Sequence, residues 1–368
     1  MPRKFQSRFP LKRYILCLWA VLISVIIFSC SGTQQKIQPG TKTALVFYYQ
    51  AEENIKQGNF TTAITNLDSA IYYNPGFANL YQLKGWVWEK LSQQDSAIIA
   101  YENCLKYRSA QPEIQKRLAL LYFETGQFEA SASYFKKTLQ AYPDTAEIHL
   151  QLGKAYHQLG FHPLALGYFQ SYRELETSPK AELWKWAGLA RFKTSAYAKA
   201  IVNLEKYIEV HKEDAAALKH LGIAKFKSGE YEDAISYLNF AEAYSKDDPE
   251  IYLYRSRYFL LADRPEIAKV QLDRALQIDS LNVNTLYELG VLYHQQEEYS
   301  KCSAKMSKVI ALENEYWPAY RYLGFLAERE NDFSKAQEYY KLYLENTIER
   351  DEEVRQRFEA VTTGVKNE

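Results

Sequence analysis

The sequence predicts an all-α protein, an α-solenoid built from nine copies of one helix–turn–helix unit. Apolar residues recur at three- and four-residue spacing in short blocks separated by turn residues, which is typical of amphipathic helices. The blocks also repeat every 34 residues, with one step of 35 around Pro179, and a constant period of this length indicates stacked repeats. Because two helices alone cannot bury both faces of a hairpin, each copy needs its neighbours.

The copy over residues 215–248 shows the unit most clearly. Two amphipathic helices are expected, separated by the turn residues Ser228 and Gly229. Gly222 in the first helix and Ala234 in the second are small, so the two backbones can approach closely. Larger apolar side chains then fill the space around the crossing.

Three positions keep their character in all nine copies when each copy is numbered from its first residue. The copies begin at Ala44, Ala78, Pro112, Ala146, Ala181, Ala215, Pro249, Val283 and Trp317. Position 8 is small and holds Ala51, Gly85, Ala119, Gly153, Gly188, Gly222, Ser256, Gly290 and Gly324. Position 20 is also small and holds Ala63, Ala97, Ser131, Ala165, Ala200, Ala234, Ala268, Cys302 and Ala336. Position 24 is large and apolar and holds Leu67, Tyr101, Phe135, Phe169, Leu204, Leu238, Leu272, Met306 and Tyr340.

This register resembles the tetratricopeptide repeat (TPR) family, whose repeat has the same length and the same small and large positions. The resemblance covers residues 44–350 and implies nine repeats wound into a right-handed superhelix. Gln50 and Arg255 replace the usual Leu at position 7, and Pro265 replaces the aromatic residue that usually opens the second helix. These departures are expected to weaken individual repeats, the seventh most.

Residues 1–29 are expected to be a lipoprotein signal peptide. Five basic residues and no acid precede an apolar run over 14–28, which is shorter than the ~20 residues of a membrane-spanning helix. Residues 27–30 (IFSC) resemble the bacterial lipobox, which implies that Cys30 carries acyl chains such as palmitate and becomes the mature N-terminus. The alternatives are a plain signal anchor or a signal cleaved elsewhere.

Residues 30–43 are expected to be the lipidated cysteine and a polar tether. The twelve residues from Ser31 to Lys42 reach at most ~40 Å when fully extended, so the first repeat would stay near the membrane. No Asp and no acidic cluster follow Cys30. The resemblance to bacterial lipoproteins therefore implies an outer-membrane location facing the periplasm.

Charge argues against nucleic acid as the main partner. The chain has a formal net charge of zero, but without the five basic residues of the signal it holds 40 basic and 45 acidic residues, a net charge of −5. Cys104 and Cys302 occupy core positions six repeats apart, too far to form a disulfide.

No pattern in the sequence points to catalysis, a metal or a cofactor. His157 and His162 are expected on opposite sides of an inter-helix turn, and the chain holds no HExxH, CxxC, GxSxG or Gly-rich phosphate loop. The protein is therefore expected not to be an enzyme, with no catalytic residue, no metal ligand and no small-molecule cofactor.

The family resemblance implies a concave groove lined by positions 2, 5, 9 and 12 of the first helices. Repeats three to seven each place one basic residue at position 5 or 9, and position 12 adds aromatic residues. The expected peptide-binding groove consists of Trp86, Lys116, Phe123, Lys154, Lys185, Phe192, Lys219, Phe226 and Arg257. A basic, partly apolar stripe on an acidic protein suits an acidic peptide or a C-terminal carboxylate. The alternative is a solvated helix face with scattered lysines.

Residues 351–368 are expected to form a capping helix and a tail. Val354, Phe358 and Val361 make one apolar stripe on a helix that opens with acids, which suits a helix N-terminus and a terminal cap.

These features predict a non-enzymatic scaffold that holds proteins or peptides at the membrane surface. It could be an adaptor for cell-wall enzymes or an assembly factor for an outer-membrane or appendage complex. A third alternative is a glycan- or peptidoglycan-binding module.

Overall fold

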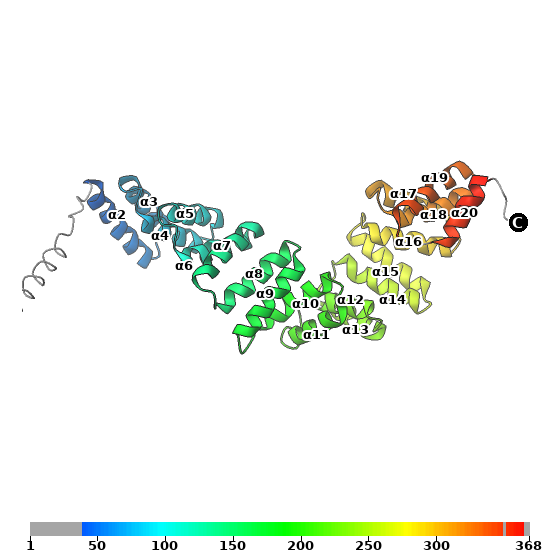
Figure 1. Ribbon diagram of the computed structural model, residues 1–368, viewed down its shortest axis with the longest axis horizontal. Helices are drawn as coiled ribbons and strands as arrows, with labels where there is room; N and C mark the ends of the chain where they lie inside the picture. The colour runs from blue at the N-terminus through cyan, green and yellow to red at the C-terminus, as the bar shows by residue number, and fades with distance from the viewer. Residues whose placement is uncertain (1–38, 349–350, 364–368) are drawn as a thin grey trace, which may run out of the picture. The chain divides into compact units, whose positions relative to one another are not determined.

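The computed structural model describes residues 39–348 and 351–363, which form nineteen helices and no strand (Figure 1). The helices are α2 (Pro39–Lys56), α3 (Phe60–Tyr73), α4 (Ala78–Lys90), α5 (Gln94–Tyr107), α6 (Pro112–Glu124), α7 (Phe128–Ala141), α8 (Ala146–Gln158), α9 (His162–Leu175), α10 (Ala181–Lys193), α11 (Tyr197–Ile208), α12 (Ala215–Lys227), α13 (Tyr231–Tyr244), α14 (Pro249–Leu261), α15 (Pro265–Ile278), α16 (Val283–Gln295), α17 (Tyr299–Leu312), α18 (Trp317–Arg329), α19 (Phe333–Asn346) and α20 (Glu352–Thr363). The all-helical repeat architecture confirms the predicted fold class.

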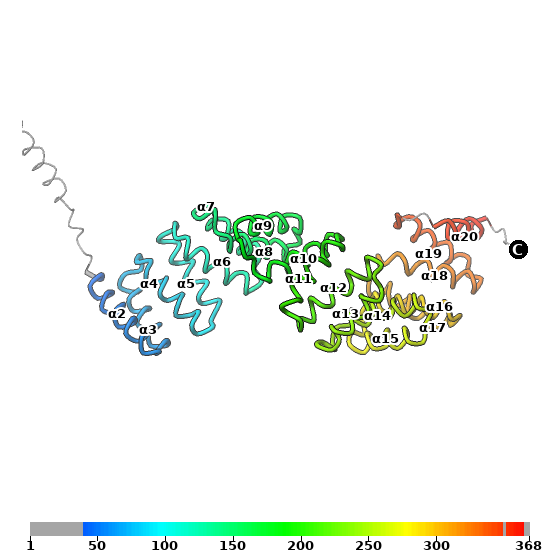
Figure 2. Tube along the Cα trace, turned by 90° about the horizontal axis from the view of Figure 1, so that it is seen from below, coloured from blue at the N-terminus to red at the C-terminus, as the bar shows by residue number. Residues whose placement is uncertain are grey.

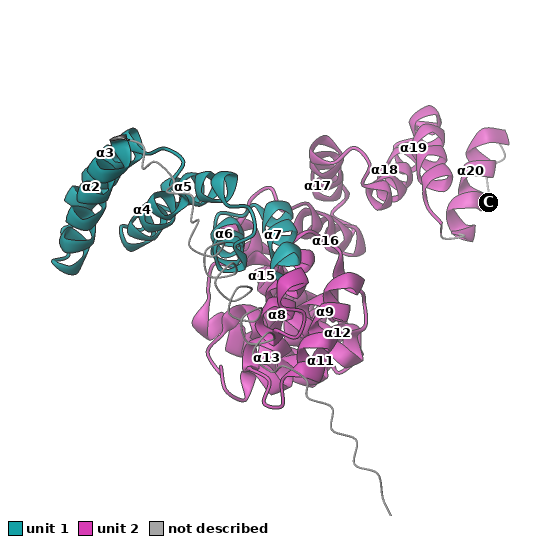
Figure 3. Ribbon diagram, turned by 60° about the vertical axis from the view of Figure 1, so that its left-hand side comes forward, with its two compact units in different colours: residues 1–138 teal, residues 139–368 magenta. Residues whose placement is uncertain are grey.

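The chain divides into two compact units, residues 1–138 and residues 139–368 (Figure 3). Unit 1 holds α2 to α6 and most of α7, and unit 2 holds the end of α7 and α8 to α20. Within each unit, helices that follow one another in sequence are also neighbours in space (Figure 2).

The first helix of each repeat begins where the 34-residue period expects it, except in the first repeat. The eight first helices α4, α6, α8, α10, α12, α14, α16 and α18 start at the first residue of their copies. Helix α2 instead starts at Pro39, so the end of the expected tether is helical. Gly40 explains how this extra turn fits, because a Cβ there would lie 2.5 Å from the Tyr73 carbonyl oxygen at the end of α3.

The small and large positions meet inside each hairpin, as the register requires. A Cβ on Gly85 would lie 2.6 Å from the Tyr101 ring, and one on Gly222 would lie 2.9 Å from Leu238 Cγ. Real side chains do not pack this closely, so position 8 must stay small wherever position 24 is large.

The turn between the two helices has the same backbone conformation in all nine repeats. Position 15 has a positive φ at Gly58, Ser92, Gly126, Gly160, Ser195, Gly229, Asp263, Glu297 and Asn331. A left-handed residue ends a helix by satisfying its last carbonyl groups, and glycine adopts this conformation without steric cost. Five of the nine repeats carry a non-glycine residue in this left-handed conformation.

The sequence departures have local explanations. Gln50 is exposed, because no described helix precedes α2. Arg255 forms an ion pair with Glu242 of the preceding repeat, and the buried Ser256 hydroxyl donates to the Leu253 carbonyl at 2.7 Å. Pro265 is the first residue of α15, where its missing N–H has no helical partner to lose.

Helix α20 closes the C-terminal end of unit 2. Val354 is fully buried in a cluster with Tyr340 and Tyr343, and Phe358 and Val361 pack against the same cluster. The helix runs to Thr363, two residues beyond the apolar stripe.

The expected signal peptide, Cys30 and most of the tether lie outside the described residues. Among the helices that are described, none combines the length and the apolar character needed to span a bilayer.

Candidate functional site: the first-helix face

The candidate site is the surface formed by the first helices of the repeats. In unit 2, consecutive first helices touch one another, as α8 touches α10 and α10 touches α12. We call the side chains at positions 2, 5, 6, 9 and 12 of these helices the first-helix face. All nine residues of the expected groove belong to it.

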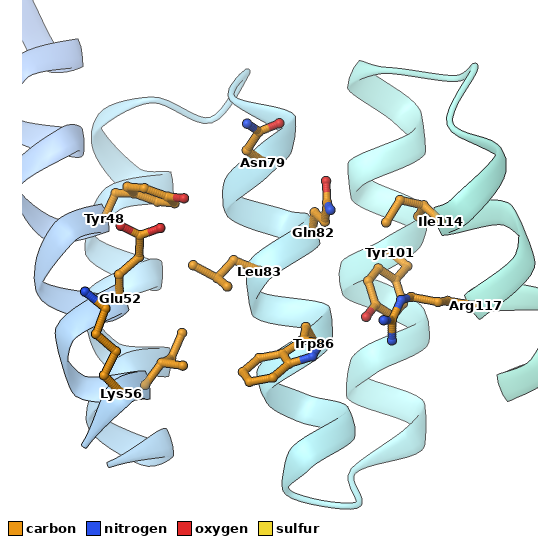
Figure 4. Close-up of a pocket in the computed structure, with 11 residues that line it drawn as sticks. Tyr48, Glu52, Lys56, Asn79, Gln82, Leu83, Trp86, Tyr101, Ile114 and Arg117 are labelled. Atoms are coloured by element: carbon orange, nitrogen blue, oxygen red, sulfur yellow. The ribbon is translucent and has the colours of Figure 1, made fainter. Parts of the chain in front are cut away.

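Unit 1 has a cavity of about 560 Å³ on this face, between the first three repeats (Figure 4). Its apolar part comes from Leu83, Trp86 and Ile55. The Trp86 ring packs edge-on against Phe60 at 6.3 Å, and Lys90 Nζ lies 5.3 Å from its centroid. Trp86 is thus half-buried, because Phe60 and Lys90 contact its ring while it lines the cavity.

Polar side chains surround the apolar part. Tyr48 and Glu52 come from α2, Asn79 and Gln82 from α4, and Arg117 from α6 (Figure 4). Burial and a hydrogen bond to Glu52 raise the pKa of Tyr48 to about 12, so its hydroxyl stays a donor at neutral pH. Asn79 Oδ1 is buried and has no hydrogen-bond partner among the described residues. The cavity therefore offers an apolar contact beside the unsatisfied amide oxygen of Asn79.

The two charged walls of the cavity differ. Arg117 Nη1 donates to Glu89 Oε2 at 3.0 Å, and the Tyr101 hydroxyl donates to the same carboxylate at 2.5 Å. Glu52, on the opposite wall, forms no ion pair with any described residue. Lys116 and Phe123 lie on α6, and the Phe123 ring packs edge-on against Phe128 at 5.3 Å.

In unit 2 the expected basic stripe is a ladder of ion pairs. Each cation meets a carboxylate of the next repeat's first helix or its N-cap: Lys154 with Glu182 at 2.7 Å, Lys185 with Asp214 at 2.6 Å, Lys219 with Asp248 at 2.7 Å and Arg257 with Glu288 at 2.7 Å. The partners are 28 to 31 residues apart, so every pair joins one repeat to the next. The charges of these four cations are therefore compensated within the chain.

The aromatic residues of the stripe also have partners. Phe192 packs edge-on against Tyr197 and His220, at 5.7 and 5.1 Å. Phe226 packs against Tyr231 and Tyr254, at 5.2 and 5.5 Å. Both rings stay half-buried at the surface.

His157 lies in α8 and His162 in α9, on opposite sides of the turn, but their rings meet across it. Their Nδ1 atoms lie 3.2 Å apart, because the turn folds the start of α9 back onto the end of α8. Burial, together with the charges of His162 and Lys193, lowers the pKa of His157 to about 4. In the described part of the chain, no group of three or more His, Cys, Asp or Glu residues is placed to hold a metal ion.

Several residues of the unit 1 cavity were not among the expected groove residues. Asn79, Gln82, Tyr48 and Glu52 occupy positions 2, 5 and 9, so reading all side chains at those positions would have found them. Leu83 and Arg117 occupy position 6, which the family's lining positions do not include, so no sequence signal pointed to them.

Comparison with known proteins agrees with the repeat pattern. A model of the tetratricopeptide repeat matches residues 116–182, 187–249 and 219–280. The TPR repeat-containing protein MJ1428 of Methanocaldococcus jannaschii is 26% identical and aligns over 67% of this chain and 43% of its own. The TPR repeat-containing protein YpiA of Bacillus subtilis is 24% identical, over 61% of this chain and 51% of its own. The chain thus spans about half the length of these relatives.

Among solved structures, the Cut9–Hcn1 hetero-tetramer of the APC/C matches with a TM-score of 0.55 at 13% identity, over 81% of this chain and 58% of that chain. A tetratricopeptide repeat protein from Parabacteroides merdae matches with a TM-score of 0.47 at 17% identity, over 65% of this chain and 94% of that chain. At this identity, the likeness to Cut9–Hcn1 shows the fold alone.

Proposed function

The chain is a tetratricopeptide repeat protein, and on that premise we propose that it is a non-enzymatic scaffold that binds partner proteins or peptides on its first-helix face. The observation that carries the proposal is the unit 1 cavity of about 560 Å³. It combines a half-buried Trp and aliphatic side chains with amide and hydroxyl groups, which is the composition of pockets that bind peptide side chains.

The ligand that fits best is an extended peptide with a large apolar side chain. That side chain would pack against Trp86 and Leu83, and the amides of Asn79 and Gln82 would hydrogen-bond to its main chain. An acidic ligand, as the basic stripe suggested, would have to compete with carboxylates already paired to Lys185 and Lys219 in unit 2. The proposal therefore rests on the unit 1 cavity and not on the ladder.

We further propose that acyl chains on Cys30 hold this scaffold on the outer membrane, facing the periplasm. The support is the basic and apolar leader, the lipobox-like residues 27–30 and the short polar segment before α2. Two or more acyl chains anchor a protein stably, at ~0.8 kcal/mol per buried methylene. Replacing Cys30 by Ala should abolish incorporation of labelled palmitate and stable membrane association. Continued palmitate labelling of this variant would contradict the proposal.

Site-specific photocrosslinking tests the binding proposal. A photoreactive residue in place of Gln82 should capture a protein in cells, whereas one in place of the exposed Tyr72, outside the cavity, should not. Trp86→Ala should reduce capture at position 82 because it removes the apolar contact, and Tyr72→Ala should leave it unchanged. Equal capture from both positions, or no effect of Trp86→Ala, would contradict a peptide site in this cavity.

The glycan-binding alternative makes a different prediction. A glycan module would be retained on purified peptidoglycan with no protein present, and Trp86→Ala would abolish retention. A scaffold that binds only protein partners would not be retained on the peptidoglycan.

A further inference from the structure

The junction of repeats four and five carries polar residues at three positions that are apolar in most other repeats. These residues are Arg173 at position 28, Arg191 at position 11 and Asn203 at position 23. In seven of the other repeats position 28 is apolar and holds Ile71, Leu105, Leu139, Ile208, Leu276, Ile310 and Leu344, and in the sixth repeat it holds Glu242.

Positions 11 and 23 of the two preceding repeats hold a stacked pair of tyrosines. Tyr122 stacks on Tyr134 with ring centroids 5.7 Å apart, and Tyr156 stacks on Tyr168 at 5.5 Å. In repeat five this ring pair is replaced by a guanidinium and an amide. Because the repeats share one backbone geometry, such a substitution marks a site with a different chemistry.

The three polar residues line one small cavity between α9, α10 and α11 of unit 2. The cavity measures about 20 Å³, room for one water-sized group, and Trp184 forms part of its wall. Asn203 is only 3% exposed, and its Nδ2 has no hydrogen-bond partner among the described residues. A buried amide donor without a partner is destabilising, because burial has removed its hydrogen bonds to water.

Neither arginine is compensated within the described part of the chain. The guanidinium groups of Arg173 and Arg191 take part in no ion pair and no side-chain hydrogen bond with residues 39–348 or 351–363. Burial and the charge of Arg173 together lower the pKa of Arg191. Two like charges thus lie close together with no carboxylate between them.

The next repeat provides the matched comparison. Lys225 also occupies position 11 and is only 5% exposed, but it pairs with three carboxylates: Glu205 at 3.1 Å, Glu230 at 2.8 Å and Asp233 at 3.4 Å. Although burial opposes its charge, these carboxylates raise the pKa of Lys225. A buried cation at this position is therefore fully compensated in repeat six.

The residues equivalent to those carboxylates are not acidic around Arg191. Gln170 stands at the place of Glu205, Ala196 at that of Glu230 and Lys199 at that of Asp233. Gln170 donates instead to Glu174 at 2.7 Å. The cavity at Arg191 thus lacks every internal anion that its neighbour possesses.

We propose that this cavity is a binding site for a small oxyanion, a carboxylate or a phosphate-type group. One oxygen of the anion would occupy the cavity and accept a hydrogen bond from Asn203 Nδ2, and Arg191 and Arg173 would bind the others. Planar guanidinium groups favour this forked recognition of carboxylate and phosphate. None of the three residues belongs to the first-helix face, so this site is independent of the proposed function.

The test is the thermal unfolding midpoint of the full chain, titrated with sodium phosphate or sodium acetate at an ionic strength kept constant with sodium chloride. A ligand that binds only the folded state raises the midpoint as its concentration exceeds Kd. Phosphate or acetate should raise the midpoint above the chloride value. Arg191→Gln should raise the anion concentration needed for the same midpoint shift about tenfold or more.

Two variants guard against indirect effects. Arg355→Gln removes an equal charge from an exposed position of α20 and should leave the response unchanged. The double variant Arg191→Tyr and Asn203→Tyr restores the ring pair of the preceding repeats, so it should fold and lose the response. A response to acetate alone identifies a carboxylate ligand, and a response to phosphate identifies a phosphate-bearing one. An equal response in Arg191→Gln, or no response beyond chloride, would overturn the proposal.

Discussion

Single residues at the helix crossings determine how closely each hairpin packs. Ala234 is fully buried, and its carbonyl oxygen would lie only 3.1 Å from a Cβ on Gly222. There is no space at this crossing for a larger side chain on either helix. The small residues at positions 8 and 20 are therefore a steric requirement and not a composition bias.

Replacing Ala234 by Leu should destabilise the protein by ~1–3 kcal/mol, because overpacking forces the two helices apart. Denaturant unfolding measures the change. Ala243→Leu is the matched control, since Ala243 is exposed on the same helix. Identical unfolding curves for the two variants would mean that position 234 does not lie at the crossing.

His157 links stability to pH. Burial lowers its pKa to about 4 in the folded state, whereas an unfolded histidine titrates near ~6.5. Because the unfolded state binds the proton more tightly, protonation of His157 favours unfolding. The free energy of unfolding therefore keeps this contribution in full above pH ~6.5 and loses it progressively as the pH falls to about 4.

Replacing His157 by Phe, the residue at position 12 of three other repeats, should remove this pH dependence. The free energy of unfolding of the wild type should fall by roughly 1–2 kcal/mol from pH 7 to pH 5 relative to His157→Phe. His211→Asn, at an exposed histidine, serves as the control and should follow the wild type. A wild type and a His157→Phe variant with parallel pH profiles would contradict the assignment.

The inter-helix turns of the repeats differ in the residue that holds the left-handed conformation. Glu297 has φ 59°, whereas Gly229 at the equivalent turn has φ 84°. A left-handed conformation costs an L-residue other than Gly, Asn or Asp roughly 1–2 kcal/mol. Part of that cost is offset because glycine loses more entropy on folding.

Glu297→Gly should therefore stabilise the protein by about 0.5–1 kcal/mol, measured as an upward shift of the denaturation midpoint. The reciprocal variant Gly229→Ala should shift the midpoint downward. If both variants shift the midpoint in the same direction, backbone strain is not the cause.

The stability of the whole molecule is distributed along the chain. Each repeat contacts mainly its neighbours, so stability is approximately a sum of local terms. We expect the seventh repeat to contribute least, because buried Arg255 Nε has no hydrogen-bond partner among the described residues and Leu261 is 60% exposed. The sixth repeat, by contrast, holds the Lys225 network of three ion pairs.

Amide hydrogen exchange of α14 and α15 should therefore be faster than that of α12 and α13. Mass spectrometry of the exchanged chain resolves the two repeats, because they lie in separate peptides. Equal protection would contradict a weak seventh repeat and would mean that the Arg255–Glu242 ion pair compensates for the exposed Leu261.

The repeat architecture follows from the amino-acid sequence alone. A 34-residue period with small residues at positions 8 and 20 places every hairpin, because helix crossings depend on side-chain size, which can be read directly. The sequence also predicted nine residues of the first-helix face, since helical spacing determines which side chains share a surface, but not Leu83 or Arg117. The lipobox at Cys30 is likewise a sequence inference, and it remains a prediction.

The partners of the charged side chains become known only from the folded structure. Lys185 pairs with Asp214, although the two residues are far apart in sequence. Arg191 and Lys225 occupy the same position of their repeats, yet Lys225 pairs with carboxylates and Arg191 pairs with none among the described residues. Such pairings depend on how one repeat is rotated against the next and on the rotamers of long side chains. A periodic pattern of apolar residues constrains neither of these, so charge compensation becomes visible only when the repeats are stacked.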